Sequence, residues 1–366
     1  MHSTLLLVIV VATALAFDFT NGFHDTANVV ASSISTRALA PRTAITLASI
    51  LNFVGAFISL KVAATVATGI IEAGQVTEMI AFAGLLGAII WNLVTWAYGL
   101  PSSSSHALIG GVIGAMLAAV GGGGVKVSGL LDKVIIPALI APVAAFLAAG
   151  LTIVLIYRLF AHRPPGPVTR GFRAGQIVTS SLLSVAHGTN DAQKTMGVIT
   201  LALVAHGTLS PKHVTVPVWV IICAASAISL GTYAGGWRII RTVGSRIIRM
   251  DSAQGFSAQG AGAVVILLSS HLGYPLSSTH VISGGVIGAG AAKRLSAVRW
   301  GVAGNIIAAW VITLPAAGLF GAAAYAVASV FGHGATGPLL IALVALAVLT
   351  GSLAARRRRM TATASA

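Results

Sequence analysis

One segment of about fifteen residues occurs twice in this chain. Residues 101–115 (PSSSSHALIGGVIGA) and 275–289 (PLSSTHVISGGVIGA) are identical at ten of fifteen positions. A shorter motif precedes each copy: GFHDTAN at 22–28 and GTNDAQK at 188–194 both place an aspartate three residues after a glycine. Because the two motifs alternate in the same order, the chain divides into two related halves of similar length.

Long apolar runs separate these motifs. Only 8% of the 366 residues are charged and 56% are hydrophobic, whereas a soluble domain carries about 25% charged residues. The runs are long enough to cross about 30 Å of hydrocarbon as helices, so we expect an all-α polytopic membrane protein. The predicted spans are 5–36, 43–71, 133–158, 174–205, 214–237, 300–330 and 336–354.

Two further apolar segments, 78–121 and 257–292, contain the repeated motif at their centre. Proline removes a backbone donor there, and the hydroxyl run competes for backbone hydrogen bonds. We therefore expect each segment to be broken into two half-helices, forming a helical hairpin with a Ser/Thr tip. The pattern leaves open whether the hairpins are re-entrant or fully spanning.

The basic residues predict an orientation. Lys and Arg cluster within 37–42, 158–173, 238–249, 293–299 and 356–359, and such clusters are typical of cytoplasmic loops. The N-terminus is then outside and the C-terminus cytoplasmic, with the first half entering from outside and the second from inside. That is an inverted-topology repeat, an architecture common among secondary transporters.

The predicted division is a first transmembrane repeat (1–160), a basic cytoplasmic linker (161–173), a second, inverted repeat (174–330), a C-terminal transmembrane helix (331–355) and a basic cytoplasmic tail (356–366). Residues 5–16 could imitate a signal peptide, but no Lys or Arg precedes them, so we expect a mature span. The loop clusters account for the net charge of +15, which argues against nucleic-acid binding. The single cysteine excludes a disulfide framework or a Cys-based metal site.

Two of the seven acidic residues, Asp25 and Asp191, lie mid-span at equivalent places in the halves. An ionisable group at that depth costs on the order of 3 kcal/mol or more, which favours binding of a cation or proton over an ion pair between helices. The small residues around each aspartate predict an unwound stretch lining a cavity. Amide oxygens of Asn28, Asn190 and Gln193 would add hard ligands. Asp18 belongs to this cavity or lies near it.

The hydroxyl tips predict an anion site. Ser103–Ser105 and Ser277–Thr279 precede half-helices that begin near His106 and His280, where free N–H groups and the positive end of the helix dipole suit a tetrahedral oxyanion. Simple N-capping is the alternative. Lys194 can pair with Asp191 or contact an anion. For His106 and His280, substrate contact, proton transfer and a buried structural role stay open.

Together these motifs resemble those of the inorganic phosphate transporter (PiT) family across nearly the whole chain. The resemblance implies a plasma-membrane symporter for inorganic phosphate that works by alternating access as a homodimer, with no enzymatic activity and no cofactor. It implies phosphate contacts at Ser104, Ser105, Ser278, Thr279, Gln193 and Lys194. Cation- or proton-linked residues would be His24, Asp25, Asn28, Asn190 and Asp191.

One departure bears on the coupling ion. The sodium-coupled members have an Asn-Asp pair in both repeats, whereas this chain has His24-Asp25 in the first. Histidine offers no amide oxygen for sodium, so the chain looks more like the bacterial low-affinity branch, which is associated with proton-coupled uptake of metal–phosphate. We favour protons and keep sodium as the alternative, and no metal site is assigned.

Electrostatics independently favours cation coupling. A phosphate dianion beside two ionised aspartates places about −4 against one lysine, and moving it inward costs roughly 4.6 kcal/mol per 100 mV. A sulfate permease is the closest alternative, since sulfate is also a tetrahedral dianion. A channel fits the sequence less specifically. A serine hydrolase is disfavoured because the chain has no G-x-S-x-G elbow.

Overall fold

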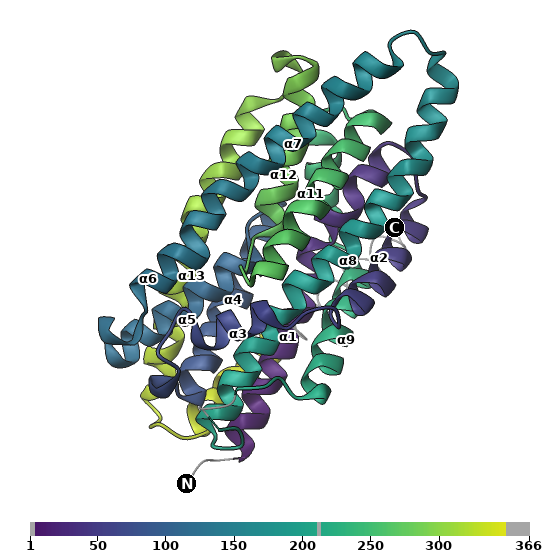
Figure 1. The fold of residues 1–366 in the computed structure, drawn as a ribbon. Coiled ribbons are helices and arrows are strands. Elements are labelled where there is room, and N and C mark those ends of the chain that lie inside the picture. Colours follow the sequence, from purple (N-terminus) through teal and green to yellow (C-terminus); the bar gives the residue numbers. More distant parts are fainter. Residues whose placement is uncertain (1–3, 211–213, 349–366) are drawn as a thin grey trace, which may run out of the picture.

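The computed structural model describes residues 4–210 and 214–348, and the helices of this part of the chain are joined by turns and loops, with no strands. The long helices lie side by side along one axis (Figure 1). The α-helices of the first half are α1 (Thr4–Ser35), α2 (Pro41–Gly55), α3 (Lys61–Thr68), α4 (Glu78–Tyr98), α5 (Ser104–Val120), α6 (Val127–Leu130) and α7 (Ile136–Phe160). The second half contains α8 (Pro165–Ala205), α9 (Val218–Ala234), α10 (Trp237–Arg241), α11 (Ser252–Leu272), α12 (Ser278–Lys293) and α13 (Trp300–Ser329).

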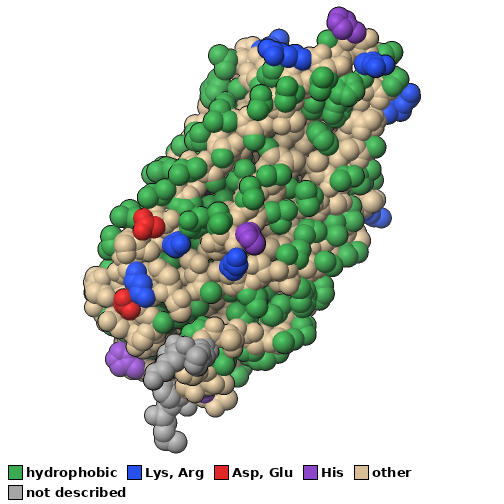
Figure 2. Space-filling view, viewed as in Figure 1, with side chains coloured by type: hydrophobic (Ala, Val, Ile, Leu, Met, Phe, Trp, Pro, Cys, Tyr) green, Lys and Arg blue, Asp and Glu red, His purple; other side chains and the backbone are tan. Residues whose placement is uncertain are grey.

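An apolar exterior identifies a multi-pass membrane protein. Five helices are long and apolar enough to cross a membrane, or six if the bent pair Val218–Ala234 and Trp237–Arg246 forms one span. Large side chains such as Leu147 of α7 and Val311 of α13 are more than 60% exposed. Hydrophobic side chains cover much of the face in Figure 2, and several Lys and Arg side chains gather at its upper end.

The two predicted helix breaks are present. Helix α4 is capped by Gly99, with φ of 66°, and α5 begins at Ser104. Equivalently, α11 is capped by Gly273, with φ of 81°, and α12 begins at Ser278. A left-handed residue is typical of helix C-caps and favours glycine, so each break combines this cap with the proline that follows.

One predicted span is wrong as a single helix. The segment 43–71 divides into α2 and the short α3, whereas 214–237 contains one helix, α9, and α10 begins at its last residue. The break between α2 and α3 has a tertiary cause, because the Gln193 amide oxygen accepts hydrogen bonds from the first-turn amides of α3. Helix α9 ends before Gly235, whose φ of 72° does not fit a helix. Helix Thr336–Val348 begins the predicted last span; the rest of that span and the basic tail lie outside the described residues.

The predicted unwinding around the aspartates is also wrong. Both α1 and α8 continue as helices through Asp25 and Asp191. The neighbouring glycines serve close packing instead: a Cβ on Gly22 would lie 2.2 Å from the Ile228 carbonyl oxygen, and one on Gly188 would lie 2.1 Å from that of Asn52. Breaks in the long helices are thus at the hydroxyl tips and not at the carboxylates.

The halves pack reciprocally. Helix α1 packs on α9 while α8 packs on α2, and α5 packs on α13 while α12 packs on α7. The glycine contacts follow the same exchange, since a Cβ on Gly55 would meet the Val185 carbonyl and one on Gly231 would meet that of Phe19. This reciprocity fits the sequence duplication. The inverted orientation in the membrane and the domain division stay predictions.

We expect Gly114→Ala to lower the unfolding temperature and the yield of folded protein. A Cβ at Gly114 would lie 1.9 Å from the backbone oxygen of Gly318 on α13, and overpacking of this kind costs about 1–3 kcal/mol or more. Gly304→Ala is the matched control, because no atom of the described residues lies within 4 Å of a Cβ there. Thermal unfolding in detergent checks the pair, and equal stabilities would contradict the packing role.

Candidate functional site

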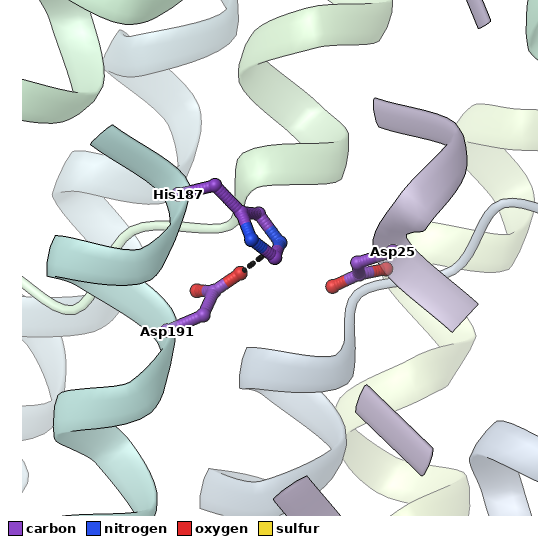
Figure 3. Close-up of side chains that lie close together, drawn as sticks. All are labelled: Asp25, His187 and Asp191. Carbon is purple, nitrogen blue, oxygen red and sulfur yellow. Dashed lines mark ion pairs between the residues drawn. The ribbon is translucent and has the colours of Figure 1, made fainter. Parts of the chain in front are cut away.

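Helices α1 and α8 bring the two predicted aspartates together inside the bundle. Asp25 of α1 and His187 and Asp191 of α8 are buried, and each offers a ligand atom within 4.8 Å of the other two. Figure 3 shows His187 beside Asp191, with Asp25 across the gap between the helices. The His187 Nε2 atom lies 2.8 Å from Asp191 Oδ2. Such a group can hold a proton or a small cation.

The Asp25 carboxylate joins the first helix to the second tip. His24 Nδ1 lies 2.8 Å from Asp25 Oδ1, and the Thr279 hydroxyl donates to the same oxygen at 3.3 Å. On its other side, His24 Nε2 lies 3.2 Å from the Thr95 hydroxyl oxygen. Asn28 donates to Thr279 Oγ1 at 2.9 Å. The first aspartate is therefore linked to α12 of the opposite half.

The Asp191 carboxylate has more donors. Asn190 Nδ2 donates to Asp191 Oδ1 at 2.9 Å and Ser278 Oγ donates to Oδ2 at 3.0 Å, while the Lys194 ammonium pairs with Oδ1. The Asn190 carbonyl oxygen is buried and has no hydrogen-bond partner among the described residues. This amide oxygen is thus available for a cation.

The two hydroxyl tips meet at Lys194. Its ammonium donates to Ser105 Oγ at 2.5 Å and to the Leu276 carbonyl at 2.7 Å. Ser105 also donates to the Leu276 carbonyl at 3.1 Å. Ser104 Oγ lies 3.5 Å from His24 Nδ1. Two helix N-termini, four hydroxyls and one ammonium consequently converge on the pair of carboxylates.

The capping alternative holds for the first residue of each tip. Ser103 Oγ accepts from the His106 amide at 3.1 Å, and Ser277 Oγ accepts from the His280 amide at 3.3 Å. These two serines serve as N-caps, which leaves the following residues to face the site. The first N–H groups of a helix have no partner within it, so the tips present backbone donors as well.

Gln193 is the predicted phosphate contact that the structure does not bring to this group. Its Oε1 accepts from the amides of Val62 at 2.8 Å and Ala63 at 3.2 Å, and its Nε2 donates to the Thr189 carbonyl. The side chain therefore caps α3. A helix start at Lys61 gave no signal in the sequence, which is why this role was missed.

Sequence reasoning also missed His187, although its spacing of four residues before Asp191 on one helix places them on the same face. The two histidines that follow the hydroxyl tips, His106 and His280, contact each other. The rings of His106 and His280 are 4.7 Å apart, and His280 stacks on Trp310 at 4.1 Å. They line a largely apolar cavity of about 600 Å³ between α7, α12 and α13.

Comparison with known proteins gives a consistent result. The profile of the phosphate transporter family matches residues 21–321. A probable low-affinity inorganic phosphate transporter of Mycobacterium leprae is 55% identical over 327 residues, which are 89% of this chain and 79% of the relative. One from Bacillus subtilis is 44% identical over 323 residues, 88% of this chain and 96% of that one. A solved structure titled "The sodium-dependent phosphate transporter" is 26% identical, with a TM-score of 0.82, covering 89% of this chain and 99% of that one.

Proposed function

The chain belongs to the phosphate transporter family, and on that premise we propose that it imports inorganic phosphate by symport with protons. The family and these relatives are transporters, not enzymes. The proposal includes symport, protons as the coupling ion and alternating access. It also includes a homodimer and the entry of phosphate as a metal complex.

The main support for this proposal is that both hydroxyl tips contact Lys194. A tetrahedral oxyanion offers several acceptor oxygens, and the hydroxyls of Ser105 and Ser278 both lie within hydrogen-bond distance of the Lys194–Asp191 pair. Charge-assisted bonds to an ammonium and bonds from helix N-termini are the means by which proteins hold phosphate. We assign the phosphate contacts to Ser104, Ser105, Ser278, Thr279 and Lys194.

The carboxylates require a coupled cation. With Asp25 and Asp191 ionised, a phosphate dianion would bring the local charge to about −4 against Lys194, which a buried site does not tolerate. Each carboxylate has an imidazole within 2.8 Å, His24 beside Asp25 and His187 beside Asp191. Histidine exchanges protons near neutral pH, and this supports protons as the coupling ion.

Transport in proteoliposomes tests the proposal. We expect an inward proton gradient to drive labelled phosphate to a higher concentration inside than outside, and a sodium gradient alone to drive little. Accumulation with sodium alone would refute proton coupling. Equilibration without accumulation would indicate a channel.

Selectivity is checked in the same vesicles. We expect a hundredfold excess of unlabelled phosphate to abolish uptake of the label, and the same excess of sulfate to leave most of it. Equal inhibition by sulfate would favour a sulfate permease over the proposed function.

A further inference from the structure

A third carboxylate lies close to the site and has no role in it so far. Asp18 is on α1, about two helical turns before Asp25, and its side chain is fully buried. Neither of its carboxylate oxygens has a hydrogen-bond partner among the described residues. An ionised carboxylate in such surroundings is costly unless a proton or cation accompanies it.

The groups around Asp18 do not neutralise it. Thr195 and Asn21 interact with it, and Asp191 and Lys194 of α8 are the charged groups that act on it. Lys194 is already bound to Asp191, Ser105 and the Leu276 carbonyl. Thr195 and Asn21 approach the Asp18 carboxylate without meeting the geometry of a hydrogen bond, and the Thr195 hydroxyl and the Asn21 carbonyl oxygen have no other partner among the described residues.

The duplicated motif shows that the fold does not need an acid here. Aligning Gly22 with Gly188 puts Ser184 in the place of Asp18. The Ser184 hydroxyl donates to the Ser180 carbonyl at 2.8 Å, so the second half satisfies this position within its own helix. The carboxylate is therefore an addition of the first half.

We propose that Asp18 is a proton-binding carboxylate of the transport cycle, which takes up one proton on a carboxylate oxygen from the outside and releases it inside with the substrate. This inference rests on the proposed function. A proton needs one acceptor atom. Hard metal cations take six or more oxygens, whereas Asp18, Asn21 and Thr195 offer four side-chain oxygens between them. The backbone carbonyls of α1 and α8 add none, because they accept hydrogen bonds within continuous helices.

The position of Asp18 also explains how a proton would favour phosphate. Protonation removes a negative charge that acts on Lys194 and Asp191, so the anion meets less repulsion at the tips. By linkage, bound phosphate raises the proton affinity of Asp18 by the same factor. Proton and phosphate then bind together without direct contact.

The test uses D18N, which mimics the protonated form, with D18E as the titratable variant and S184A as the control at the equivalent position. We expect D18N to keep at least half of the wild-type phosphate exchange between equal concentrations. Its accumulation driven by a pH gradient should fall at least tenfold, with one proton fewer moved per phosphate. D18E should recover both, and S184A should match the wild type.

Infrared spectroscopy separates this inference from the proposed function. A protonated-carboxyl band at neutral pH in the wild type, absent from D18N, supports the assignment whether or not phosphate is transported. Three results would overturn it: an unchanged proton count in D18N, loss of exchange together with accumulation in D18N, or absence of the band from the wild type. Lack of phosphate uptake by the wild type, with the band present, would instead count against the proposed function.

Discussion

Replacing Lys194 with methionine should reduce phosphate uptake by at least about 100-fold. The ammonium pairs with Asp191 and bonds to Ser105 Oγ at 2.5 Å and the Leu276 carbonyl at 2.7 Å. Truncating one partner of a buried charge pair costs about 2–5 kcal/mol, and 2.7 kcal/mol corresponds to about 100-fold. Methionine matches the lysine side chain as far as Cε and fills irregular space well, so initial rates in proteoliposomes report the loss of the ammonium group.

Lys293→Met is the matched control. Lys293 also pairs with an aspartate, Asp251, at 3.0 Å, but both side chains are at least 40% exposed, and surface pairs contribute about 0–1 kcal/mol. We expect its uptake within about twofold of the wild type. Uptake by Lys194→Met above a tenth of the wild-type rate, from protein of unchanged thermal stability, would refute the phosphate contact.

Replacing Asp191 with asparagine is expected to remove the same pair from its other side. The uncharged amide would leave Lys194 without its counter-ion and would prevent proton or cation binding at this position, so uptake should again be lost. Asp251→Asn serves as the control because Asp251 caps α11 from the surface. Undiminished uptake by Asp191→Asn would contradict the coupling role of the carboxylate.

The parts of the site that could be predicted from the sequence are those that occur in both halves of the chain. A repeated proline and hydroxyl run predicts a helix break wherever it occurs, and the breaks before Ser104 and Ser278 are present. Two aspartates at equivalent places in two packed halves are expected to approach each other, and Asp25 and Asp191 do. These inferences need only local chemistry and the two-fold repetition.

The remaining features depend on contacts between segments far apart in the sequence. The start of α3 depends on the Gln193 side chain, which lies 131 residues from Val62 in the sequence. The length of the apolar run carries no sign of this contact, so it predicted α2 and α3 as one span. The glycines beside the aspartates were interpreted as sites of unwinding, whereas they admit the backbones of α9 and α2. Glycine weakens a helix and also allows close packing, and only the partner helix distinguishes the two.

His24 is one of the positions at which the two halves differ in chemistry. Asn190 occupies the equivalent place, where its Nδ2 donates to Asp191 and its carbonyl oxygen is left without a hydrogen-bond partner among the described residues. In the first half, imidazole nitrogens occupy that position, and His24 Nδ1 contacts Asp25 Oδ1 at 2.8 Å. Asparagine at this position would keep a donor to Asp25 and add an amide oxygen.

We therefore expect His24→Asn to give the transporter a response to sodium. Hard cations bind carboxylate and amide oxygens, so an inward sodium gradient should stimulate uptake by the variant at least about fivefold while leaving the wild type little changed. His24→Gln is the control, because its longer side chain carries the same amide away from the position of the Asn190 oxygen. Uptake by the His24→Asn variant under a pH gradient should persist in part, since Asp18 is unaltered. A variant that transports phosphate well but ignores sodium would show that this residue does not select the ion, and the difference between the repeats would then need another explanation.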